Sequence, residues 1–112
     1  MKNRISECIQ KSAENFNTIL TDENLLHTIE QIVGLCIVAF RNDKKMLLCG
    51  NGGSASDAQH IAAELSGRFY KDRNPLYAEA LHVNSSFITA VANDYGYDET
   101  YARMAEAAGR EG

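Results

Sequence analysis

The residues best suited to chemistry lie in the segment CGNGGSASDAQHIAAE, which runs from position 49 to position 64. It begins with a glycine-rich turn that also holds Asn51 and Ser54. Glycines let a backbone approach a ligand closely, and a helix that starts after such a turn directs free N–H groups and the positive end of its dipole outward. These features favour a phosphate-binding site, and a plain tight turn is the alternative.

Two familiar nucleotide-binding motifs fit this turn poorly. The P-loop pattern needs a lysine directly after its glycines, and the next lysine here is Lys71. GNGGSA satisfies the loose dinucleotide pattern G-x-G-x-x-A, but the next predicted strand ends in His82 and Val83, where an acidic residue would hold the ribose. A nicotinamide cofactor is therefore not expected.

A second group of chemically active residues follows on the predicted helix. His60 and Glu64 are four residues apart and share one helix face, with Asp57 one turn earlier. A carboxylate in this position could remove a proton from a carbon beside a sugar carbonyl. His60 and Glu64 could also supply two ligands to a divalent metal. The alternative is an exposed pair of side chains on a solvated helix.

Asn93 and Asp94 form a further polar cluster, in the segment NDYG. Amide and carboxylate side chains in a tight turn often bond to their own backbone, and in a sugar enzyme they also bind hydroxyl groups. The spacing leaves both interpretations open. Arg68 and Arg73 could face a phosphate, although exposed arginines commonly have no such role, and His82 is expected to be structural.

The elements that must position these residues are two long helices followed by alternating strands and helices. Helical periodicity covers 3–19, and a second apolar stripe, capped by Thr21 or Asp22, ends near Phe40. A capping box of Ser54 and Asp57 is expected to open the third helix. The later elements are strands over 46–49 and 77–82, and helices over 54–65, 85–92 (capped by Ser85 or Ser86) and 98–108. This order is the start of an α/β layer fold with a parallel sheet.

Length and composition limit the class of protein. The chain has 112 residues, 45% of them hydrophobic, which suits one small domain at most. Two strands do not make a stable parallel sheet alone, so we expect the chain to be part of a longer domain. A net charge of −4 without a basic run argues against nucleic acid or an anionic membrane as partner. The three cysteines form no C-x-x-C pair, and no signal peptide is visible. The longest apolar run, 32–40, is too short to span a bilayer. These observations predict a reduced, cytoplasmic protein.

Three segments together resemble a known family. CGNGGSASDAQHIAAELSGR, AVANDYGYDE and AEAAGREG are similar to the bacterial phosphoheptose isomerases, which belong to the sugar isomerase (SIS) domain family. The resemblance implies a SIS-type three-layer α/β fold with a parallel sheet. Residues 1–112 would be its N-terminal part, with oligomerisation helices in 1–44 and the start of the sugar-phosphate-binding layer in 45–112. The C-terminal part would be absent.

The resemblance also implies an activity, the interconversion of sedoheptulose 7-phosphate and D-glycero-D-manno-heptose 7-phosphate through an enediol, on the way to the heptose of lipopolysaccharide. Glu64 would be the catalytic base, and His60 and Glu64 would bind zinc, with the remaining ligands in the missing C-terminal part. The substrate-binding residues would be Asn51, Gly52, Gly53, Ser54, Glu64, Asn93 and Asp94.

The family is cytoplasmic and tetrameric, so a homo-oligomer is expected, and the chain alone is expected to be inactive. Two alternatives from other classes are a non-catalytic SIS scaffold that binds a replication initiator and a sugar-phosphate-sensing domain. A scaffold has no need of a base at Glu64, so the carboxylate favours the enzyme.

Overall fold

The computed structural model describes residues 1–111, so Gly112, the last residue of the predicted domain, lies outside the described residues. The chain divides into two compact units, Met1–Ile37 and the residues from Val38 onward. Helix α1 (Lys2–Thr21) and most of helix α2 (Glu23–Arg41) form the first unit, which confirms the two predicted long helices. Of the two candidate caps, Asp22 is the correct one, because its Oδ1 accepts the N–H of Leu25 at 3.0 Å.

Most apolar side chains of α1 and α2 are solvent-exposed, and neither helix contains a buried residue. The most exposed are Ile5, Ile9, Phe16, Leu20, Leu35 and Val38. An apolar surface of this extent is typical of helices that pack against other protein. By length and composition alone α2 is also apolar enough to cross a membrane, a test that packed helices of soluble proteins pass as well.

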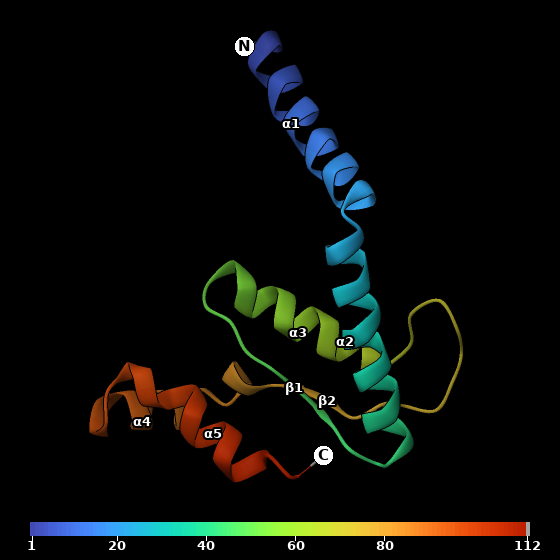
Figure 1. The fold of residues 1–112 in the computed structure, drawn as a ribbon. Helices are drawn as coiled ribbons and strands as arrows, with labels where there is room; N and C mark the ends of the chain where they lie inside the picture. Colours follow the sequence, from blue (N-terminus) through green and yellow to red (C-terminus); the bar gives the residue numbers. More distant parts are fainter. Residues whose placement is uncertain (112) are drawn as a thin grey trace. The chain divides into compact units, whose positions relative to one another are not determined.

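The second unit begins with a strand–helix–strand unit, β1 (Met46–Leu48), α3 (Gly53–Ser66) and β2 (Ala78–Ala80) (Figure 1). The two strands pair in parallel, with Met46 opposite Ala78 and Leu48 opposite Ala80. Parallel neighbours require a crossover connection, which α3 supplies. The predicted α/β class with a parallel sheet is therefore confirmed.

Small side chains bring α3 close to this sheet. Ala58 and Ala62 of α3 pack on Ala78 and Ala80 of β2, and all four are buried. The flanking side chains are those of Met46, Leu48 and Leu65. Because an alanine side chain is a single methyl group, the helix axis lies close to the strands, and the two ends of α3 are fixed relative to the sheet.

The rest of the unit consists of short helices that follow β2. They are η1 (Leu81–Val83), α4 (Ser85–Asp94), η2 (Tyr97–Glu99) and α5 (Thr100–Ala108), with α4 and α5 side by side in Figure 1. Two details of the prediction are wrong here. The second strand ends at Ala80 instead of residue 82, and α4 is capped by Asn84, whose Oδ1 accepts the N–H of Phe87 at 3.0 Å, instead of by a serine.

The alanine contact predicts that Ala62→Leu will lower the free energy of unfolding by about 1–3 kcal/mol, because the extra carbons have no space between α3 and β2. Urea denaturation followed by circular dichroism measures this change. Ala63→Leu is the matched control, since Ala63 is exposed on the same helix and surface changes alter stability by less than about 0.5 kcal/mol. Equal effects of the two substitutions would contradict the packing described here.

Candidate functional site

The loop that connects β1 to α3 ends at Gly52, whose backbone has a positive φ. Gly52 has φ +57° and ψ −121°, values that L side chains rarely adopt, and α3 starts at the next residue, Gly53. The N-terminus of α3 has no side-chain cap, so the predicted capping box of Ser54 and Asp57 is wrong. Both residues lie inside the helix. The backbone of Gly52 makes the turn that a capping side chain would otherwise stabilise.

Gly50 allows this loop to fold against the first turn of α3. A Cβ placed on Gly50 would lie 2.5 Å from the carbonyl oxygen of Ser54 and 2.7 Å from its Cβ, distances shorter than any real contact. Glycine is therefore the only residue that fits here without a shift of the backbone. Gly50 thus lets the loop lie against its own helix, and the close approach of the loop to a phosphate stays a prediction.

Several donors of the loop remain free. The N–H of Ser54 donates to the carbonyl of Asn51 at 3.1 Å, and the N–H of Ala55 donates to the carbonyl of Gly52 at 3.2 Å. Within residues 1–111, no acceptor pairs with the N–H groups of Gly52 and Gly53 or with the Ser54 hydroxyl. All these groups are exposed at the positive end of the α3 dipole. Such an arrangement binds an anionic oxygen.

Two tyrosines that the sequence analysis did not single out contact this loop. The Tyr97 hydroxyl donates to Oδ1 of Asn51 at 2.6 Å, and the Tyr101 hydroxyl donates to the carbonyl of Gly50 at 2.7 Å. The hydrogen-bonded neighbour Tyr97 and partial burial raise the pKa of Tyr101 to about 12. No short-range pattern could have revealed these contacts, because 46 residues separate Tyr97 from Asn51.

His60 and Glu64 lie together, as their spacing predicts. Nε2 of His60 is 3.1 Å from Oε1 of Glu64, and the exposed fractions of the two side chains are 75% and 34%. They line an open groove of about 540 Å³, with Asp57, Ile61, Leu65 and Phe69 as its other residues. Among the residues that the structure describes, no third His, Cys, Asp or Glu joins them in a metal-binding group.

Arg73 holds the C-terminal end of α3, close to Glu64. Its guanidinium donates to the carbonyl of Leu65 at 2.8 Å and to the carbonyl of Glu64 at 3.1 Å. The last carbonyls of a helix lack partners within the helix, and a cation beside them also interacts favourably with the helix dipole. Arg73 is therefore a capping residue, not a free phosphate ligand.

Asn93 and Asp94 occupy the last turn of α4, where a loop was expected. Nδ2 of Asn93 donates to Oδ1 of Asp94 at 3.0 Å, and both side chains are exposed. Within the described part of the chain, neither forms a hydrogen bond with the 50–54 loop or with the His60–Glu64 pair. The structure thus joins the two side chains by a hydrogen bond, and their role in substrate binding stays a prediction.

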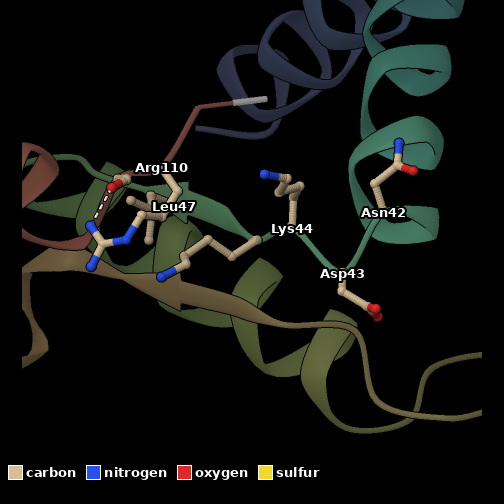
Figure 2. Close-up of a pocket in the computed structure, with 7 residues that line it drawn as sticks. Asn42, Asp43, Lys44, Leu47 and Arg110 are labelled. Atoms are coloured by element: carbon tan, nitrogen blue, oxygen red, sulfur yellow. Dashed lines mark hydrogen bonds between the residues drawn. The ribbon is translucent and has the colours of Figure 1, made fainter.

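A second cavity, of about 400 Å³, lies beside the start of β1 and is lined by residues 42–45, Leu47, Gly109 and Arg110 (Figure 2). Three cations line it, a composition that favours an anion site. Lys45 Nζ, however, donates to the carbonyl of Ala108 at 2.9 Å, and Lys44 and Arg110 also donate to main-chain carbonyls. These cations hold the C-terminal end of α5, so the free donors near Gly52 make the better anion site.

Comparisons with known proteins agree on one family. The SIS domain family matches residues 7–111. A phosphoheptose isomerase from Sulfurimonas denitrificans is 50% identical over all of this chain and 57% of its own length, and one from Clostridium acetobutylicum is 48% identical with the same coverage. The chain therefore spans a little over half the length of the curated relatives it matches.

Solved structures give the same result. The phosphoheptose isomerase from Neisseria gonorrhoeae matches with a TM-score of 0.87 at 36% identity, over 97% of this chain and 55% of that one. The phosphoheptose isomerase from Francisella tularensis matches with a TM-score of 0.90 at 32% identity, over 97% of this chain and 56% of that one. The SIS-type fold that the resemblance implies is thus confirmed.

The packing of Gly50 predicts that Gly50→Ala will destabilise the chain by about 1–3 kcal/mol, because the new methyl group meets the backbone of Ser54. Gly53→Ala is the control: a Cβ at that position has nothing within 4 Å, and its φ is not positive. Thermal denaturation of both variants measures the difference. A stable Gly50→Ala variant would show that the loop does not lie against α3.

Proposed function

The chain belongs to the SIS domain family, and we propose that it supplies part of an enzyme that interconverts sedoheptulose 7-phosphate and D-glycero-D-manno-heptose 7-phosphate. One observation carries the proposal: α3 begins at a loop with free donors and bears Glu64 in a groove. The names of the relatives described above agree with an isomerase more than with a replication scaffold or a sugar-phosphate sensor.

The loop is proposed to bind the substrate. The free N–H groups of Gly52 and Gly53, the Ser54 hydroxyl and the side chain of Asn51 would donate to oxygens of the sugar phosphate, with Ser54 at the phosphate. Asn93 and Asp94 are proposed to bind sugar hydroxyls.

Glu64 is proposed to move the proton. Its Oε1 faces His60, which leaves Oε2 to accept a proton from C1 of the ketose. The C–H electrons form the C1=C2 bond of the enediol, and the former carbonyl oxygen at C2 takes up a proton. The C1 hydroxyl then gives up its proton as the carbonyl forms at C1, and the carboxyl group returns the carbon-bound proton to C2 to give the aldose. The groove that holds this carboxylate is also lined by the apolar side chains Ile61, Leu65 and Phe69. General base catalysis at a positioned carboxylate contributes about 10²–10⁴-fold to a rate.

The exposed helices support a homo-oligomer. Helices α1 and α2 contain no buried residue, and apolar surfaces of this extent commonly pack against other protein. The exposed apolar faces of α1 and α2 would bring the copies together, in a homotetramer as the resemblance implies.

A zinc ion is proposed at His60 and Glu64. Imidazole and carboxylate are ordinary zinc ligands, and the pair would supply two of the four that a tetrahedral site needs. The remaining ligands would come from residues outside this chain segment. A bound divalent ion would polarise the sugar carbonyl. A cytoplasmic location is proposed as well, which agrees with three free cysteines in the described residues.

The assignment of Glu64 predicts that Glu64→Gln will reduce the turnover of sedoheptulose 7-phosphate about 10²–10⁴-fold, because an amide cannot accept the proton. The assay uses a chimera in which residues 1–112 replace the matching segment of the Sulfurimonas denitrificans enzyme. Glu106→Gln, at an exposed position on α5, is the control and should keep full activity. Unchanged turnover in Glu64→Gln would exclude this residue as the base.

The length of the chain relative to its relatives gives another prediction. The 112-residue chain should show no isomerisation of sedoheptulose 7-phosphate by itself, because part of the site would lie in the segment that only the longer relatives contain. A product assay on the purified chain, run beside the chimera, measures this. Turnover by the isolated chain would show that residues 1–112 contain a complete site.

A further inference from the structure

We propose that Tyr97 and Tyr101 are positioning residues, whose hydroxyls hold the side-chain amide of Asn51 so that its NH₂ group faces a bound oxygen of the sugar phosphate. The inference rests on the proposed function in one respect, namely that the loop containing Asn51 binds the substrate. It adds two residues from a distant segment to the site and gives each a role.

The distance between Tyr97 and Asn51 determines which way the amide points. The Tyr97 oxygen lies 2.6 Å from Asn51 Oδ1. Hydrogen bonds of about 2.5–3.0 Å are normal for an O–H donor to an oxygen, whereas N–H donors keep about 2.7–3.2 Å. The short contact therefore fits the amide oxygen and not the amide nitrogen. With Oδ1 facing Tyr97, the NH₂ group must point away from it.

Tyr101 fixes the neighbouring backbone. Its single proton is directed to the carbonyl of Gly50 at 2.7 Å, with Asn51 Oδ1 at 3.0 Å as a second, more distant acceptor. The two phenol rings meet edge to face with their centroids 6.3 Å apart. One tyrosine thus orients the side chain of Asn51, and the other holds the peptide that precedes it.

The tyrosines are themselves held in place. Thr100, which lies between the two tyrosines in the sequence, is fully buried. Its Oγ1 donates to the carbonyl of Tyr97 at 2.8 Å. Gly96, with φ +100°, makes the turn from α4 into η2. Because the pKa of Tyr101 is about 12, this hydroxyl stays protonated and remains a donor at neutral pH.

The consequence is a preorganised donor group. In the part of the chain that the structure describes, no group accepts from Nδ2 of Asn51, so both of its N–H bonds are available. They belong to the residue that directly precedes Gly52 and Gly53, whose own N–H groups are also free in the described residues. An amide that is already oriented loses less conformational entropy when a ligand binds than one that rotates freely. The ligand class is an anionic or hydroxyl oxygen of a sugar phosphate.

The test compares Tyr97→Phe and Tyr101→Phe with the control Tyr95→Phe in the chimera that carries residues 1–112 in the Sulfurimonas denitrificans enzyme. Tyr95 is exposed, and its ring contacts Arg103, so its hydroxyl has no part in the network. Two quantities are measured: the NMR signals of the Asn51 side-chain amide, and the Kd for sedoheptulose 7-phosphate by calorimetry. Thermal denaturation checks that each variant is folded.

We expect Tyr97→Phe to shift the Asn51 amide signals and to raise the Kd about threefold to tenfold, the effect of losing one orienting hydrogen bond. Tyr101→Phe should raise the Kd with a smaller shift of these signals, and Tyr95→Phe should change neither. Amide signals and Kd values equal to those of the wild type in both network variants would overturn the inference. If the chimera with unchanged residues 1–112 binds no sugar phosphate, the proposed function fails, and the amide signals alone still decide whether the tyrosines hold Asn51.

Discussion

The approach of Gly50 to the first turn of α3 is the contact on which the rest of the site depends. Because no Cβ separates the loop from Ser54, the chain turns directly from β1 into the helix, and the N–H groups of Gly52 and Gly53 are left facing solvent. A larger residue at position 50 would displace the loop from the helix end, and the free donors would no longer share one place with the positive end of the helix dipole.

Helix α3 carries both halves of the proposed chemistry, and both of its ends are tied by side chains from elsewhere. Tyrosines of η2 and α5 hold the loop at its start, and Arg73 caps its last carbonyls beside Glu64. Between the ends, alanines keep the helix against the sheet. A rigid element with fixed ends suits a site whose groups must be held in place before the substrate arrives.

The order of the elements, the parallel sheet and the glycine turn that leads into α3 could all be predicted from sequence, because periodicity and glycine chemistry are local. The helix caps were harder: adjacent residues could all cap, and the fold selected Asn84 over Ser85 and replaced a Ser54 cap with the backbone of Gly52. The tyrosine contacts could not be predicted. They join residues that are 46 and 51 positions apart in the chain, and these residues meet only once the sheet and α5 have folded.

That separation has a consequence for synthesis. The loop and α3 are made first, and the hydroxyl that orients Asn51 belongs to a residue 46 positions later. At a translation rate of about 5–20 residues per second, the delay is roughly 2–9 s. During this interval the nascent chain contains the loop residues but not the tyrosine that orients Asn51. The residues of the donor set are therefore synthesised in stages, and the hydroxyl that orients the amide is added late.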